Sequence, residues 1–342
     1  MADSDKLNRR RVLQTGTVLL AGLAGCTDSD SSDGGSGDGS DGADGGDGGN
    51  TNEPTETDTP REAESVVGQV VSGESLQMVV RETSYTKTLG EFSEADEGKE
   101  FLVVRMAAKN TSDEYTNFSG FWQARVKDSE NHVYDSSFES TSRPLNSGVL
   151  APGEVTRGDL VFELPEDASE LTLQFDFEVI SWTDFSRVNI DLEQQADSIG
   201  DVSQSLDISI NGPGDSTSHG TVGVTLNSVR MTEQVGDYAE AEEGHEFVIT
   251  DIEIENQGDE PLSVSTLLQM AVKDGEGFTY GSDLSATSEL DRAYEEGSKI
   301  AAGESRRGEI AYEAPKDASL LYWVFDFLDF DAEMKAFWKV KG

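Results

Sequence analysis

The chain of 342 residues contains one cysteine, Cys26, and this scarcity limits both its folding and its chemistry. A single thiol has no partner for a disulfide within the chain. The domains that follow Cys26 therefore have no disulfide, no cysteine-based metal site and no cysteine nucleophile. Their stability has to come from packed cores alone.

Basic residues are also scarce, with 25 Lys and Arg against 68 Asp and Glu and a net charge of -43. Nucleic acids and anionic membrane surfaces would repel such a chain, and we therefore expect no nucleic acid as a partner. Exposed charges interact over about 8 Å at 0.15 M salt but only about 3 Å at 1 M, so concentrated salt removes most of the self-repulsion. Acidic residues occur in both halves of the chain, as Glu94 and Glu240 show, and are not confined to a tail.

Catalytic signatures are absent. The sequence has neither a Gly-x-Ser-x-Gly nor a His-Glu-x-x-His pattern. Its three histidines, His132, His219 and His245, have no partner at metal-ligand spacing, and we expect them on the surface. We therefore predict no catalytic residue, no metal site and no cofactor, and we expect a protein that is not an enzyme.

Long apolar runs are missing as well, and the longest one, residues 12–25, has a different role. A membrane-spanning helix needs about 20 apolar residues, whereas this run is shorter and is interrupted by glycine. It follows Arg9 and Arg10 and ends at Cys26. These three features, in this order, predict an export signal over residues 1–25.

Two motifs in this segment resemble known export signals. Asn-Arg-Arg-Arg-Val-Leu-Gln, which contains Arg9 and Arg10, resembles a twin-arginine translocation signal, and Leu-Ala-Gly-Cys resembles a lipoprotein lipobox. The resemblance implies a lipid on Cys26 and anchoring at the extracellular face of the cytoplasmic membrane. Together with the acidity, the chain resembles haloarchaeal lipoproteins.

Residues 26–64 consist mainly of Gly, Asp, Ser and Thr and contain nothing that could seed a core. This composition predicts a disordered linker that lifts the domains off the membrane. The Asp-Gly pairs within it match no calcium-binding repeat.

The rest of the chain contains an internal repeat. Glu-Gly-Lys-Glu-Phe at residues 97–101 recurs as Glu-Gly-His-Glu-Phe at 243–247, and the same spacing aligns Asn110 with Asn256 and Tyr134 with Tyr280. After an insertion in the second copy, Gly153-Glu154 aligns with Gly303-Glu304. We therefore predict two related domains, at residues 65–195 and 202–342.

Apolar residues alternate with other residues within each copy, for example at Leu76, Met78 and Val80 and at Leu171, Leu173 and Phe175. Turn sequences separate these runs. The pattern predicts an all-β fold of two tandem immunoglobulin-like antiparallel β-sandwiches made of half-buried strands. The connector at residues 193–215 is rich in Gly, Ser and Asp, so we expect the two domains to move independently.

The order of these motifs is similar to the DUF4352, telokin-like domain of exported prokaryotic lipoproteins. The resemblance rests on turn and core markers and implies a fold and a location, but no reaction. The second copy departs from it at Ala302 and Tyr312, where the first has Pro152 and Phe162. The markers in the first copy are Gly98, Asn110, Asp128, Tyr134, Pro152, Gly153, Glu154, Gly158, Phe162 and Pro165.

Three groups of residues leave alternatives open. Asn110 and Asn117 match the N-glycosylation acceptor pattern, although Asn110 also suits a structural turn. The turns that begin at Asp128 and Asp274 offer carboxylates for calcium, but we favour simple hairpin turns. The aromatic residues at alternating positions fill the cores, and Trp338 is the candidate for an exposed contact.

We expect a lipid-anchored cell-surface protein with a non-catalytic binding role and a protein of the envelope as its partner. The alternatives are an accessory or hydrolytic enzyme that acts on envelope polymers, which would need carboxylates gathered in one cleft, and a passive spacer.

The charge imbalance predicts that the domains unfold as salt is diluted. Thermal unfolding of the chain, followed by circular dichroism between 3 M and 0.1 M KCl, should show a midpoint that falls as the repulsion becomes unscreened. An unchanged midpoint over this range would contradict the interpretation.

Overall fold

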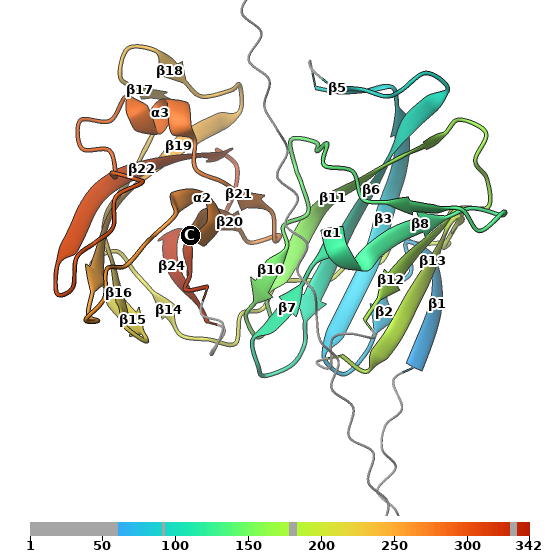
Figure 1. The fold of residues 1–342 in the computed structure, drawn as a ribbon, viewed down its shortest axis with the longest axis horizontal. Helices are drawn as coiled ribbons and strands as arrows, with labels where there is room; N and C mark the ends of the chain where they lie inside the picture. The colour runs from blue at the N-terminus through green and yellow to red at the C-terminus, as the bar shows by residue number, and fades with distance from the viewer. Residues whose placement is uncertain (1–60, 91–92, 178–182, 329–333) are drawn as a thin grey trace, which may run out of the picture. The chain divides into compact units, whose positions relative to one another are not determined.

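The computed structural model describes residues 61–90, 93–177, 183–328 and 334–342, which all belong to one compact unit, Glu56–Gly342. Within it the chain forms two β-sandwiches in sequence (Figure 1). Sandwich 1 contains the strands β1 to β13, and sandwich 2 contains β14 to β24. The predicted all-β fold of two tandem sandwiches is thus confirmed.

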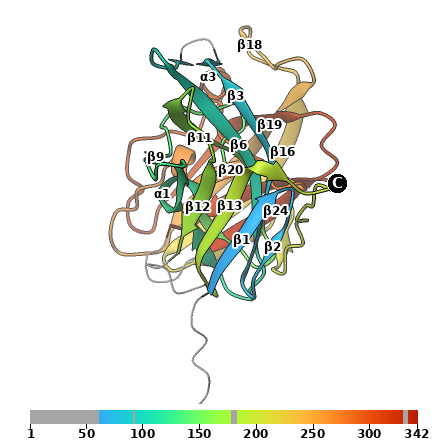
Figure 2. The same ribbon diagram turned by 90° about the vertical axis from the view of Figure 1, so that its right-hand side faces the viewer.

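Sandwich 1 packs a five-stranded sheet, in the order β1-β13-β12-β8-β9, on a four-stranded sheet, in the order β11-β6-β3-β2. In Figure 2 the strands β1, β13 and β12 run side by side. The elements are β1 (Arg61–Val67), β2 (Val71–Ser72), β3 (Leu76–Thr86), β4 (Thr88–Leu89), β5 (Ser93–Glu94), β6 (Lys99–Asn110), β7 (Thr116–Phe118), α1 (Gly120–Gln123), β8 (Ala124–Lys127), β9 (Val133–Asp135), β10 (Gly148–Leu150), β11 (Val155–Pro165), β12 (Thr172–Asp176) and β13 (Phe185–Gln195).

Sandwich 2 repeats this plan, with sheets in the orders β14-β24-β23-β20-β21 and β15-β16-β19-β22. Its elements are β14 (Ile210–Asn211), β15 (Ser216–His219), β16 (Val222–Thr232), β17 (Gln234–Val235), β18 (Ala239–Glu240), β19 (His245–Asn256), α2 (Thr266–Gln269), β20 (Met270–Asp274), β21 (Thr279–Tyr280), α3 (Leu284–Ser288), β22 (Ser305–Pro315), β23 (Leu321–Asp326) and β24 (Lys335–Lys341).

The first strand of each sandwich departs from the predicted antiparallel pattern. β1 pairs with β13, and β14 pairs with β24, in parallel. Each pair joins segments far apart in the sequence, so no tight hairpin forces them to run antiparallel. β1 begins at Arg61, inside the stretch predicted as linker, because its backbone completes the edge of this sheet.

The central strands are buried on both faces, whereas alternation predicted half-buried strands. In β6, Leu102, Val104 and Met106 enter the main core of sandwich 1. On the opposite face, Phe101 and Val103 pack with Leu89 in a second apolar cluster. Segments outside the two sheets cover this face, which local periodicity does not indicate.

The aromatic residues at alternating positions form the cores, as predicted. Phe118, Phe175 and Phe177 stack in sandwich 1. Trp338, however, is fully buried, so the prediction of an exposed contact there is wrong. Its ring lies 4.8 Å from that of Trp323, because β24 runs between β14 and β23 and is not a free tail.

Among the residues that the structure describes, no helix combines the length and the apolar character needed to cross a bilayer.

Candidate functional site

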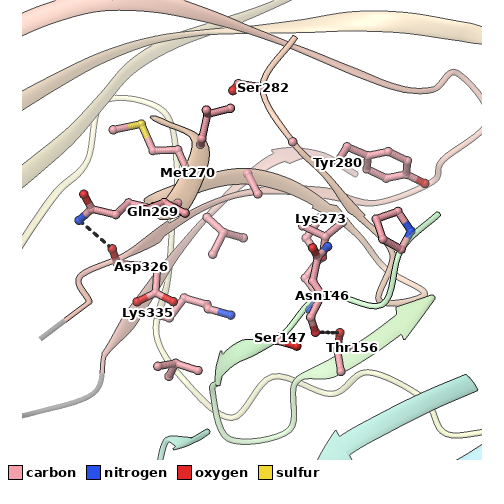
Figure 3. A pocket seen from close by; sticks show the side chains of 18 of the residues that line it. Asn146, Ser147, Thr156, Gln269, Met270, Lys273, Tyr280, Ser282, Asp326 and Lys335 are labelled. Atoms are coloured by element: carbon pink, nitrogen blue, oxygen red, sulfur yellow. Dashed lines mark hydrogen bonds between the residues drawn. The ribbon is translucent and has the colours of Figure 1, made fainter. Parts of the chain in front are cut away.

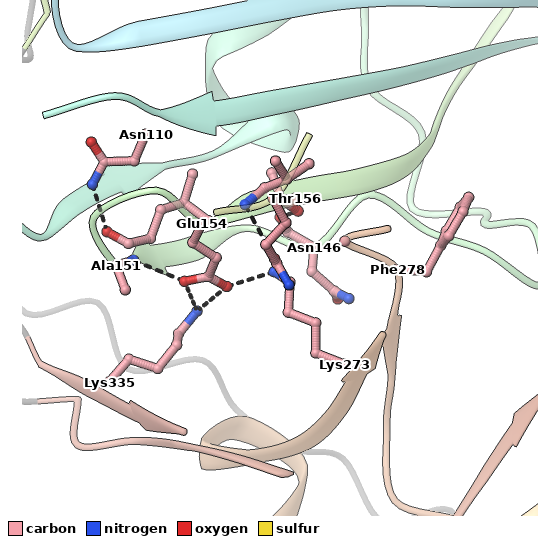
Figure 4. A network of polar contacts seen from close by, with 12 residues as sticks. Asn110, Asn146, Ala151, Glu154, Thr156, Lys273, Phe278 and Lys335 are labelled. Atoms are coloured by element: carbon pink, nitrogen blue, oxygen red, sulfur yellow. Dashed lines mark hydrogen bonds and ion pairs between the residues drawn. The ribbon is translucent and has the colours of Figure 1, made fainter. Parts of the chain in front are cut away.

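A buried cluster of charges lies at the junction of the two sandwiches (Figure 4). Glu154, at the turn before β11, accepts hydrogen bonds from Lys273 Nζ of β20 at 2.5 Å and from Lys335 Nζ of β24 at 3.2 Å. Its second carboxylate oxygen accepts one from the backbone N–H of Ala151 at 2.8 Å. The side chains of Glu154 and Lys273 are 1% and 4% exposed, so both charges have left water.

Burial acts to raise the pKa of Glu154, but the positive charges of Lys273 and Lys335 outweigh it and hold that pKa below its ordinary value. The carboxylate is therefore ionised at neutral pH. Breaking such a pair leaves an uncompensated charge in a site of low dielectric.

The connector also packs against both sandwiches. Arg157 of β11 donates through Nε to the carbonyl oxygen of Glu276 and through its terminal nitrogen to Asp201. Gln204 donates to the carbonyl oxygen of Asp274 at 3.2 Å. Leu206 packs with an apolar cluster at the junction, so the connector is packed against the sandwiches, whereas its composition led us to expect domains that move independently.

Gly153 shows why the sequence suits this arrangement. Its φ is +75°, and a Cβ there would lie 1.8 Å from the carbonyl oxygen of Ser205, so only glycine admits the connector. Its counterpart Gly303 has no neighbour within 4 Å of such a Cβ, and Glu304 beside it is exposed. The two copies thus share a turn motif, but only the first uses it to join the sandwiches.

A pocket of about 680 Å³ opens beside this cluster (Figure 3). Lys273 and Lys335 line it together with Asp326, whose pKa is raised by burial. Leu267 and Leu268 of α2 form an apolar part of its wall. The pocket therefore combines an apolar wall with two ammonium groups that are already paired with Glu154.

The two turns considered for calcium use their aspartates internally. Asp128 accepts hydrogen bonds from the backbone N–H groups of Glu130 and His132 and from the hydroxyl of Tyr134. Burial acts to raise the pKa of Asp128, but these hydrogen bonds, with that of Tyr134 foremost, lower it to about 2. Asp274 closes the equivalent turn in the same way, with Tyr280 as hydroxyl donor. This geometry is that of the hairpin turns we favoured.

Asn110, predicted as a glycosylation acceptor, is fully buried. Its side-chain amide donates to the carbonyl oxygens of Glu114 and Leu150, and its oxygen accepts from Ser112. An acceptor must be exposed, so the glycosylation prediction for Asn110 is wrong and its structural interpretation holds. Asn117, on β7, is exposed and stays a prediction.

The histidines occupy different surroundings. His132 is exposed and lies 3.1 Å from Asp128, while the ring of His219 packs edge-on against Phe327. His245 lies with Glu242 and Glu313, and one ligand atom from each of the three falls within 4.8 Å of the others. This group cannot be found from residue spacing, because only the pairing of β19 with β22 brings Glu313 to the same place. Cys26, Arg9 and Arg10 lie outside the described residues.

The buried cluster predicts a large effect of removing its one carboxylate. Glu154→Gln should lower the free energy of unfolding by about 3–5 kcal/mol, because Lys273 stays buried without its counter-charge. Glu304→Gln, at the equivalent exposed position, should change it by less than about 0.5 kcal/mol. Denaturant titration at constant salt measures both. Equal effects would show that the ion cluster does not stabilise the junction.

The domain of unknown function DUF4352 matches the chain twice, at residues 65–185 and 212–333. No curated protein matches. Among solved structures, the chain is similar to a conserved protein of Bacillus anthracis, with 20% identity, a TM-score of 0.31 and coverage of 38% of this chain and 95% of the other. A β-sandwich protein of Clostridium difficile has 16% identity, a TM-score of 0.29 and coverage of 40% and 98%.

A Bacillus subtilis protein described as a lipoprotein has 17% identity, a TM-score of 0.31 and coverage of 36% of this chain and 39% of its own. None of these comparisons indicates a catalytic family. Because the two family matches together span more than half of the sequence, the chain belongs to the DUF4352 family, of which it carries two domains.

Proposed function

We propose that this chain is an exported lipoprotein, held by a lipid on Cys26 at the extracellular face of the cytoplasmic membrane, that docks a protein of the envelope without catalysis. The anchoring part rests on the arginine pair Arg9-Arg10 and the Leu-Ala-Gly-Cys motif. The docking part rests on an exposed aromatic cluster of sandwich 1.

This aromatic cluster consists of Phe121, Trp122 and Phe138. Trp122, on the helix α1, is 77% exposed, and Phe138, in the segment after β9, is 89% exposed. The ring of Phe121 lies 4.9 Å from each of the other two rings, so the three side chains form one apolar group. Large aromatic residues that gather in water mark interaction surfaces, where tryptophan is a frequent contributor to binding energy.

The second copy keeps apolar side chains at the same three repeat positions. Leu267 and Leu268 of α2 are 58% and 73% exposed, and Leu284 of α3 is 58% exposed. Apolar residues stand at all three matched positions, and all but the half-buried Phe121 are exposed, which is difficult to attribute to chance in a chain crowded with acids. The repeat therefore supports a binding role for this part of each sandwich.

The charge of the chain favours a protein as the occupant of the aromatic cluster. A net charge of -43 opposes approach to an anionic lipid surface or a nucleic acid. A passive spacer would not need aromatic side chains in water. The hydrolytic alternative would need carboxylates gathered in one cleft, and of those that line the pocket Glu154 is paired with Lys273 and Lys335, while the N-cap residue Asp283 accepts a hydrogen bond from the backbone N–H of Ala286.

The docking proposal predicts a partner that depends on the cluster. Crosslinking in intact cells at native salt, with purification through a C-terminal tag, should recover an envelope protein with the wild-type chain and lose it with Trp122→Ser combined with Phe138→Ser. Tyr238→Ser removes an exposed ring of similar size, 86% accessible, elsewhere on the surface and should retain the partner. Capture of the same proteins by all three chains would contradict docking through the cluster.

The anchoring proposal predicts that Cys26→Ser releases the protein into the medium, because the lipid is then absent. Immunoblotting of the membrane and medium fractions measures this, with Ser29→Ala as a control that should stay on the membrane. Retention of the Cys26→Ser chain would mean that another anchor holds it.

A further inference from the structure

Each sandwich places three side chains close together at the start of its longest central strand, which is β6 in sandwich 1 and β19 in sandwich 2. The three positions are equivalent in the two copies. In sandwich 1 these are Asp96, Lys99 and Glu163. The ammonium of Lys99 lies 2.9 Å from Asp96 and 3.1 Å from Glu163, so one cation bridges two carboxylates. The hydrogen bonds to Asp96 and then to Glu163 raise the pKa of Lys99, which keeps it charged.

The backbone around this group is the same in both copies. The N–H of Asp96 donates to Glu163 Oε1 at 2.8 Å, and that of Lys99 donates to the carbonyl oxygen of Asp96 at 3.0 Å. In sandwich 2 the N–H of Glu242 donates to the equivalent Glu313 at 2.6 Å. The N–H of His245 donates to the carbonyl oxygen of Glu242 at 2.9 Å.

What differs is the cation. Sandwich 2 keeps two carboxylates, from Glu242 and Glu313, but has the imidazole of His245 in place of the lysine ammonium. The Nδ1 atom of His245 is buried and has no hydrogen-bond partner. The second copy thus keeps the two carboxylates but lacks the lysine ammonium that lies between them in the first copy. It also leaves His245 Nδ1 without a hydrogen-bond partner.

We propose that Glu242, His245 and Glu313 bind a divalent transition-metal ion of the zinc class, which takes the electrostatic place of the Lys99 ammonium. Imidazole nitrogen and carboxylate oxygen together are ligands of such ions, whereas calcium and magnesium take oxygen almost exclusively. Three protein ligands leave a coordination position for water.

The geometry permits coordination with small movements. The three ligand atoms lie within 4.8 Å of one another, and each has to come within about 2.0–2.2 Å of the ion. Glu242 is exposed and free to adjust, while the half-buried His245 and Glu313 are held by neighbouring strands β19 and β22. The site belongs to sandwich 2 alone and is independent of the aromatic cluster.

The test uses the full chain with Cys26→Ser, which removes the only thiol, after treatment with a chelator and in 2 M KCl to suppress diffuse binding to surface acids. Zn²⁺ is titrated by calorimetry, and Co²⁺ is used as a spectroscopic probe of ligand type. Wild type should bind one Zn²⁺ in saturable fashion, unaffected by excess Mg²⁺.

Two exchanges between the copies make the test specific. His245→Lys introduces into sandwich 2 the ammonium that sandwich 1 has, and it should abolish the saturable binding of Zn²⁺. Lys99→His removes the ammonium from sandwich 1, and this variant should bind a second Zn²⁺. His132→Asn, at an exposed histidine, should leave the binding of one ion unchanged. Circular dichroism verifies that each variant is folded.

The proposal is overturned if wild type shows no saturable binding, or if His245→Lys binds Zn²⁺ as wild type does, since surface carboxylates alone would then account for it. Loss of binding in His245→Lys with retention in His132→Asn supports it. If His245→Lys fails to fold, Lys99→His decides the question: a second bound Zn²⁺ supports the proposal, and its absence overturns it.

Discussion

The ionised carboxylate of Glu154, enclosed between Lys273 and Lys335, is the interaction on which the arrangement of the two sandwiches depends. It comes from sandwich 1, and both of its partners come from sandwich 2. Because a buried charge without a counter-charge is costly, separating the sandwiches requires either water to enter the junction or the charges to be lost. The connector packs at the same junction. Arg157 donates a hydrogen bond to Asp201 of the connector, and Gly153 leaves room for the backbone of Ser205.

The duplication explains much of the molecule, and the differences between the copies explain its candidate sites. Glu154 is buried at the junction, whereas Glu304 is exposed. Lys99 bridges two carboxylates, whereas His245 faces an equivalent pair. In the first comparison the side chain is the same and its burial differs, whereas in the second the side chain itself is exchanged. Related backbone frames thus provide a structural contact at Lys99 and a candidate binding site at His245.

The sequence predicted the fold well because its evidence is local. Alternating apolar residues and turn motifs indicated the strands, and the repeat indicated two domains. Burial depends on neighbours that local patterns do not reveal. Trp338 and Asn110 were placed on the surface, yet β24 is an interior strand and Asn110 closes a turn with its own amide.

The candidate sites were harder to predict for the same reason. Glu154 stood in a turn motif that both copies share, but nothing in the sequence indicated that it meets Lys273. Glu313 reaches His245 only through sheet pairing. The replacement of Lys99 by His245 at the equivalent position of the second copy was the signal in the sequence that indicated an exchanged cation.

The central claim, that the buried junction makes the two sandwiches one body, is tested most directly by ¹⁵N NMR relaxation of the full chain at high salt. The account predicts one rotational correlation time for the amides of β6 and β19. Two distinct and shorter correlation times, each suited to a single sandwich, would contradict it.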